Sequence, residues 1–211
     1  EAVAAAFGIE VRALQLLHTL PATIGGQQGL ILRTEETGEQ DFEVLLPADA
    51  VPAAWNQLMT SGAPFGIKPV GAQARELLRI EAGLPKAGPD LNEEIVPPEA
   101  NLEGKAFSLS KGCYPGQEVV ARMDTYGNVR RHLVGLIIQD KTVPPAGSKL
   151  FSGDREVGWV SSAVFSPQRN AALAFGFPLR DFSAPDTTLT VEVAGTRHQA
   201  TVHALPFQKH S

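Results

Sequence analysis

The sequence KGCYPGQE at positions 111–118 separates two parts of the chain whose hydrophobic patterns differ. Before it, segments with helical spacing are mixed with short strand-like runs. After it, short apolar runs follow one another with turn residues between them. The segment 86–110, which leads into this stretch, is rich in Pro, Gly, Glu and Asn, as long functional or inter-domain connections often are. We therefore divide the chain into an α+β part at 1–104, a connector at 105–130 and a β part at 131–211.

The β part is marked by regular turn signals. They are Pro144-Pro145, Gly153, Ser166-Pro167 and Gly195. The apolar runs between them lie at 132–138, 149–151, 157–160, 172–175, 189–193 and 199–203. Short strands at such even spacing predict a small all-β barrel or sandwich.

The first part of the chain mixes helices and strands. A short helix is expected at 1–8, and the runs at 29–33 and 42–46 read as two strands joined by a turn at 37–39. The segment 11–19 combines alternation with a continuous apolar run, so its pattern is compatible with either a strand or a helix.

Two further helices have clearer boundaries. Asp49 is placed to cap the first, Pro52 lies in its first turn and Gly62 lies past its end. Its apolar stripe is expected to face the core and consists of Val51, Ala54, Trp55, Leu58 and Met59. The second helix is predicted at 71–83, where Gly83 ends it.

Glu81 interrupts the apolar stripe of this second helix. The stripe runs through Ala74, Leu77 and Leu78, and Glu81 occupies the next position on the same face. A carboxylate there must be paired, hydrogen-bonded or directed at a ligand, unless the helix end frays and the side chain reaches solvent. Arg75 and Arg79 could pair with Glu76 or bind a ligand.

Cys113 is the only cysteine of the chain and precedes a segment that reads as a helix at 117–122. Backbone N–H groups at a helix start and the nearby Lys111 would favour the thiolate. The alternative is a buried, inert cysteine in a tight turn. Close to it, Arg122, Arg130 and Arg131 form a cationic cluster that could bind an anion or simply be a solvated turn.

Composition excludes several function classes. The net charge of −5 over 211 residues argues against a general nucleic-acid-binding protein, and one cysteine excludes an internal disulfide. The five histidines are scattered without metal-ligand spacing, so we expect no dedicated metal site. No apolar run could span a membrane and no signal peptide opens the chain, which predicts a cytoplasmic protein, or a mitochondrial matrix protein in a eukaryote. The first residues read as part of a helix without an initiator methionine, so we expect further sequence upstream.

Several motifs carry a resemblance to a known family. KGCYPGQE at 111–118 resembles the K-G-C-Y-x-G-Q-E signature of the YgfZ folate-binding proteins, which are related to the glycine-cleavage T-protein, a tetrahydrofolate-dependent aminomethyltransferase. Three further blocks resemble the family in the same order. They are TGEQDFE at 37–43, with Asp41 in place of a glycine, LRIEAGLP at 78–85 and VGWVSS at 157–162.

The resemblance implies a fold in which ferredoxin-like α+β units are followed by an antiparallel β-barrel around a folate site. It implies that Glu81 is the carboxylate that hydrogen-bonds the pterin ring and that Cys113 is a reactive thiol. Further candidates for cofactor binding are Lys111, Tyr114, Gln117, Glu118 and Arg122. A family aspartate that acts on the folate would lie upstream, and Ala87 replaces a tyrosine common before the Gly88/Asp90 pair.

The function expected from this resemblance is a folate-binding factor for assembly or repair of iron–sulfur enzymes, with an indirect effect on tRNA modification. Its cofactor would be tetrahydrofolate or a one-carbon derivative, and its partners iron–sulfur proteins or assembly factors, without direct nucleic-acid or membrane binding. One alternative is a tetrahydrofolate-dependent aminomethyltransferase of glycine cleavage. The other is a non-catalytic interaction scaffold that has kept the fold.

Overall fold

The computed structural model describes residues 1–37, 39–118, 120–121 and 129–207. They form two compact units, one comprising Glu1–Arg75 and the other beginning at Glu76. The boundary falls inside helix α3 (Ala72–Glu81), so this helix contributes residues to both units. The predicted division at 104 and 130 follows the sequence pattern instead, and stays a prediction.

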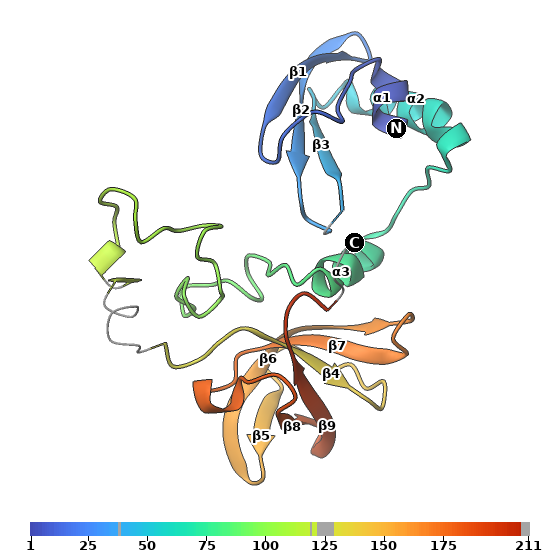
Figure 1. Ribbon diagram of the computed structural model, residues 1–211. Coiled ribbons are helices and arrows are strands. Elements are labelled where there is room, and N and C mark those ends of the chain that lie inside the picture. The colour runs from blue at the N-terminus through green and yellow to red at the C-terminus, as the bar shows by residue number, and fades with distance from the viewer. Residues whose placement is uncertain (38, 119, 122–128, 208–211) are drawn as a thin grey trace. The chain divides into compact units, whose positions relative to one another are not determined.

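The first unit pairs a small antiparallel sheet with helices (Figure 1). Its elements are α1 (Ala2–Phe7), β1 (Thr19–Ile24), β2 (Gln27–Thr34), β3 (Asp41–Leu45), α2 (Val51–Gly62) and the 3₁₀ turn η1 (Ala63–Phe65). The strands pair in the order β1-β2-β3. The predicted first helix is confirmed, and it ends at Gly8 in the left-handed conformation with φ of 66°. The ambiguous segment 11–19 forms turns that lead into β1.

Two expectations about α2 are wrong. Val51 is 48% exposed and Trp55 is 51% exposed, because the core of this unit closes around the Ala54 face of the helix. Asp49 does not cap α2, since the helical hydrogen bonding already begins at Ala50, whose carbonyl accepts from the N–H of Ala54. The helix therefore starts without a side-chain cap.

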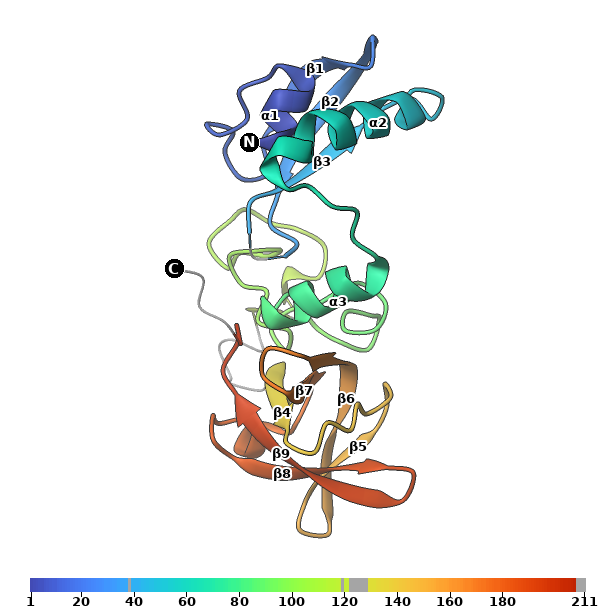
Figure 2. The same ribbon diagram turned by 90° about the vertical axis from the view of Figure 1, so that its right-hand side faces the viewer.

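The second unit contains a closed antiparallel barrel (Figures 1 and 2). Its strands are β4 (Val134–Ile138), β5 (Lys149–Ser152), β6 (Arg155–Ser166), β7 (Ala171–Gly176), β8 (Thr188–Val193) and β9 (Thr196–His203), with the 3₁₀ turn η2 (Arg180–Phe182) after β7. They close in the order β4-β7-β6-β5-β8-β9. The predicted fold class, an α+β part followed by an antiparallel β-barrel, is confirmed, and the barrel is selected over the sandwich.

Strand β7 is buried on both of its faces. Successive side chains of a strand point to opposite sides, so Ala172 and Ala174 enter the barrel core while Leu173 and Phe175 point outward. Outside the barrel, Leu173 and Phe175 belong to a second apolar cluster that includes Ile80 of α3. The end of α3 is therefore attached to the outer face of the barrel, next to β7 (Figures 1 and 2).

The apolar stripe predicted for α3 is wrong. Leu78 is 40% exposed, and the residues that the helix buries are Arg79, Ile80 and Glu81. These are the last three residues of α3, so the helix buries its C-terminal end and not one face, which helical periodicity does not indicate. After α3, the chain runs through turns to the barrel, and Gln117, Glu118, Val120 and Ala121 are helical as predicted. In the described residues, no helix is long and apolar enough to cross a bilayer.

Candidate functional site

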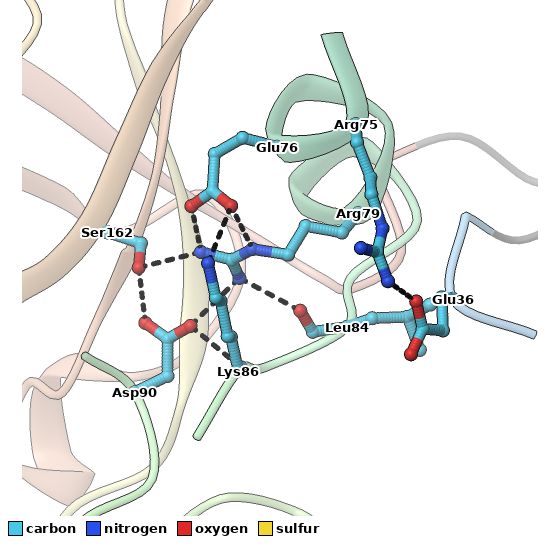
Figure 3. A network of polar contacts seen from close by, with 8 residues as sticks. All are labelled: Glu36, Arg75, Glu76, Arg79, Leu84, Lys86, Asp90 and Ser162. Carbon is cyan, nitrogen blue, oxygen red and sulfur yellow. Dashed lines mark hydrogen bonds and ion pairs between the residues drawn. The ribbon is translucent and has the colours of Figure 1, made fainter. Parts of the chain in front are cut away.

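Arg79 is at the centre of a buried polar network beneath α3 (Figure 3). Its Nη1 donates to Asp90 Oδ2 at 2.9 Å and to the carbonyl of Leu84 at 3.0 Å, and its Nε donates to Glu76 Oε2 at 2.8 Å. Its Nη2 donates to Ser162 Oγ at 3.0 Å and pairs with the other carboxylate oxygen of Glu76. Every donor direction of the guanidinium is thereby matched, which is what a buried arginine requires.

The expected pairing of Arg79 with Glu76 is confirmed. The hydrogen bond from Arg79 lowers the pKa of Glu76 against the opposing effect of burial, and the charges of Arg79 and Lys86 lower it further. Burial alone would lower the pKa of Arg79, but Glu76 and Asp90 outweigh it, so the net pKa of Arg79 is raised. Arg75, on the same helix, pairs instead with Glu36 (Figure 3).

Asp90 joins this arginine to the barrel. It is fully buried, and its Oδ1 accepts from Ser161 Oγ at 2.5 Å and from Ser162 Oγ at 2.7 Å. Its Oδ2 accepts from Arg79 and from the backbone N–H of Lys86 at 3.0 Å. A buried carboxylate is tolerated when it is paired and hydrogen-bonded in this way.

A β-bulge allows both serines to reach the same carboxylate oxygen. In a regular strand, neighbouring side chains such as Ser161 and Ser162 would point to opposite faces. The pairing of β6 with β7 shifts between Val160 and Ser162, so two residues of β6 occupy the space of one. Both hydroxyls consequently point at Asp90.

Glu81 ends α3 and is only 8% exposed. Its Oε1 accepts from Ser166 Oγ at 2.7 Å, and its backbone carbonyl accepts from the N–H of Phe207 at 3.0 Å. The solvent-exposed alternative for Glu81 is therefore wrong, and the side chain is buried and hydrogen-bonded as expected from the broken stripe. Among the described residues, no group donates a hydrogen bond to its other carboxylate oxygen, Oε2.

The KGCYPGQE stretch lies in the connector. Cys113 is exposed, so the buried, inert alternative is wrong. The ammonium of Lys111 lies 4.5 Å from the centre of the Tyr114 ring, and the buried hydroxyl of Tyr114 has no hydrogen-bond partner among the residues described. Gln117 is partly buried and Glu118 is exposed.

Within the described ranges, no hydrogen bond or ion pair connects residues 111–118 with Glu81. Arg122 lies outside the described residues, while Arg131 of the same cationic cluster stacks on Trp159, 4.8 Å from the ring centre. The roles assigned to Cys113 and to the cofactor-binding candidates of this region stay predictions. In the part of the chain that the structure describes, no group of three His, Cys, Asp or Glu residues could hold a metal ion.

Sequence reasoning missed the role of Asp90 and its serine partners. The available signals were the Ser161-Ser162 pair inside an otherwise apolar strand and an aspartate in a loop shortly after an arginine-containing helix. Neither signal indicates which residues will contact each other, because Arg79 and Ser162 are 83 positions apart in the chain. Only the folded chain brings them together.

Comparisons with known proteins point to one family. A family model described as GCVT N-terminal domain matches residues 1–109, and one described as glycine cleavage T-protein C-terminal barrel domain matches residues 131–209. An aminomethyltransferase of Chlorobium limicola is 35% identical over 86% of this chain and 50% of its own length. One of Saccharopolyspora erythraea is 37% identical over 88% of this chain and 51% of its own length.

A solved structure gives the same result. The glycine cleavage system aminomethyltransferase T of Bartonella henselae superposes with a TM-score of 0.86 at 27% identity, covering 98% of this chain and 56% of that protein. The chain thus spans about half the length of the curated relatives that it matches.

These findings correct the expected function. The relatives at 30–37% identity and the solved neighbour are all named aminomethyltransferases. An assembly or repair factor for iron–sulfur enzymes, with iron–sulfur partners and an effect on tRNA modification, was the wrong prediction. The glycine-cleavage alternative agrees better with the comparisons.

Proposed function

Because this chain belongs to the glycine cleavage T-protein family, we propose that it holds tetrahydrofolate for aminomethyl transfer, with Glu81 as the carboxylate that binds the folate ring. The observation that carries the proposal is the state of Glu81. One carboxylate oxygen is fixed by Ser166, while the other has no donor among the described residues.

The chemistry of Glu81 fits a pterin. The edge of a pterin ring presents neighbouring N–H donors, and an ionised carboxylate is an acceptor with two oxygens and several lone pairs. Hydrogen bonds between such donors and a charged carboxylate are stronger than neutral ones. Because Glu81 is only 8% exposed, its carboxylate lies in surroundings of lower dielectric than bulk water, where such a hydrogen bond is stronger.

The residues around Glu81 orient it. Ser166 holds one oxygen, and the backbone hydrogen bond between Glu81 and Phe207 fixes the helix end. Two residues earlier on α3, Arg79 is attached to the barrel through Asp90 and Ser162. When bound, tetrahydrofolate would supply the nitrogen that accepts the one-carbon unit, and this part of the chain would hold the ring in place.

We also propose a finer assignment within the family, to the YgfZ-type folate-binding proteins. It is supported by the KGCYPGQE match at 111–118 and by Ala87, which stands where a tyrosine is common. In this assignment the exposed thiol of Cys113 is the reactive group of the connector. Lys111, Tyr114, Gln117, Glu118 and Arg122 would serve the same ligand.

The test is tetrahydrofolate binding by the protein and its Glu81→Gln variant, measured by anaerobic isothermal titration. Gln keeps the shape of Glu81 but removes the charge, and hydrogen bonds to charged groups contribute about 1.5–3 kcal/mol. We expect the Kd to rise by about ten- to a hundredfold. Glu93→Gln, at an exposed position, is the matched control and should bind as the unaltered protein does.

Two results would contradict the proposal. One is unchanged affinity of the Glu81→Gln variant, which would mean that another residue binds the folate ring. The other is absence of any heat with the unaltered protein, which would favour the non-catalytic scaffold. Equal melting temperatures of the two variants show that a lost affinity does not come from unfolding.

A further inference from the structure

A pocket of about 490 Å³ lies in the second unit, next to the C-terminal end of α3. It is lined by residues that follow α3, such as Ala82 and Gly83, by Lys105 of the connector, by the start of β4 and by the residues after β9. Its volume is in the range of small-molecule sites. We propose that this pocket binds a small organic anion, with an apolar body against its walls and a carboxylate held by Lys105, His132 and His203.

Apolar atoms make up about half of the pocket surface. Leucine, valine, proline and alanine residues contribute this part of the lining. Examples are Leu102, Leu133 and Leu205. Ligand sites typically combine such walls with a few polar groups that fix orientation.

Among the described residues that line the pocket, the ionisable side chains are all basic. Asn101 already uses its amide nitrogen on the carbonyl of Leu133 at 2.9 Å, and Ser183 donates to the carbonyl of Arg180 at 2.7 Å. Lys105 is exposed and has no ion-pair partner in the described residues. None of the described lining residues is Asp or Glu, although the whole chain carries a net charge of −5.

The histidines add further donor capacity. The Nδ1 of His203 contacts the carbonyl of Ala204 at 2.5 Å, and its ring stacks on Phe207 with 5.4 Å between centres. Donation from Nδ1 to that carbonyl leaves Nε2 as the ring nitrogen that a ligand could contact. The ring of His132 has no hydrogen-bond partner among the residues described.

The electrostatic surroundings of His132 favour an anion. Burial and, next, the positive charge of Arg180 hold the pKa of His132 below its ordinary value of 6.5, while Glu99 acts in the opposite direction. Lys105 and His203 line the same pocket. A bound carboxylate would oppose the effects of burial and Arg180, so the ligand and a proton on His132 should bind cooperatively.

An adjoining pocket limits where the anionic end can lie. It has a volume of about 330 Å³, shares Asn101 and His132 with the first, and is lined also by Glu103. The carboxylate of Glu103 would repel an anion there. The ligand's charged end is therefore expected in the first pocket, which Lys105, His132 and His203 line.

This inference goes beyond the proposed folate site and does not depend on it, since Glu81 is not among the pocket-lining residues. The probe is benzoate, an apolar ring with one carboxylate, and benzamide is its uncharged counterpart. Both are titrated into the protein with isotope-labelled histidine, and binding is followed by NMR. We expect millimolar affinity for benzoate, as is usual for a fragment of this size, and about tenfold weaker binding of benzamide.

The variant that tests the pocket is Lys105→Gln, and the matched control is Lys68→Gln, an exposed lysine of the other unit. The loss of one charge-assisted contact should weaken benzoate binding about tenfold in the Lys105 variant and leave the control unchanged. Saturating benzoate should raise the pKa of His132, and its affinity should increase between pH 7 and pH 5.5.

Three results would overturn the proposal. Equal binding of benzoate and benzamide would show that the pocket recognises only the ring. An unchanged affinity in Lys105→Gln, or a His132 titration that benzoate does not shift, would place the bound anion elsewhere. Binding of inorganic phosphate as tightly as benzoate would show an anion site without the apolar component.

Discussion

Asp90→Asn tests the attachment of α3 to the barrel. The amide oxygen of Asn can still accept from Ser161 and Ser162. Its nitrogen, however, would face Nη1 of Arg79 and the N–H of Lys86, so donors would meet a donor. Removing one member of a buried ion pair costs about 3–5 kcal/mol. Because Glu76 still neutralises Arg79, we expect a loss near the lower end, about 3 kcal/mol.

The chain allows the two units to be followed separately. It has two tryptophans, Trp55 in the first unit and Trp159 on β6 of the second. In a Trp55→Phe background, fluorescence of Trp159 during urea unfolding reports the barrel unit. With a urea m value of about 2 kcal/mol/M, Asp90→Asn should lower the midpoint by about 1.5 M without changing m.

Asp181→Asn, at an exposed aspartate on η2, is the control and should unfold like the background protein. A loss smaller than about 1 kcal/mol in Asp90→Asn would refute the reasoning, since it would approach the change of about 0.5 kcal/mol that ordinary surface substitutions cause. It would mean that Arg79 is held by Glu76 alone.

Gly158→Ala should lower the melting temperature of the barrel, because a Cβ there would lie 2.3 Å from the carbonyl oxygen of Phe177; overpacking of this kind costs about 1–3 kcal/mol. Gly71→Ala, with open space around it, is the control, and equal melting temperatures would contradict the expected clash. Because the pKa of Glu76 is lowered in the folded protein, its ionised form stabilises the fold at pH values above its ordinary pKa of 4.5. This stability is lost as pH falls through the pKa of Glu76 in the folded protein. In Glu76→Gln the unfolding free energy should therefore depend less on pH below about 4.5 than in the unaltered protein. Equal pH dependence in the two proteins would contradict the pairing of Glu76 with Arg79. His132 likewise favours folding in its neutral form, so acidification below 6.5 destabilises the protein, and His132→Asn should flatten the profile from 6.5 downward; an unchanged slope would refute the effect.

The barrel could be predicted because its information is local. Short apolar runs between turn residues place each strand, and the closed strand order agrees with the predicted class. The caps and stripes of the helices were less reliable. Trp55 fits the helical period of α2, but no periodicity shows that the core contacts Ala54 and leaves Trp55 half exposed.

The site could be predicted only in part. Glu81 was recognised because a carboxylate interrupted an apparent stripe, although the stripe itself did not face the core. The burial of Arg79 could not be predicted, because a helix face that carries an arginine reads as solvated. It becomes favourable only through Asp90 and Ser162, residues that sequence periodicity does not connect with α3.

The hydrogen bond between Glu81 and Ser166 limits how the two family domains can be exchanged between relatives. Glu81 falls in the stretch that matches the N-terminal family domain, but its hydroxyl partner is the last residue of β6. A chimera joined between residues 110 and 130 would take Glu81 from one parent and Ser166 from the other. To keep each compact unit whole, the junction has to lie before Glu76, so that Glu81 comes from the same parent as the barrel.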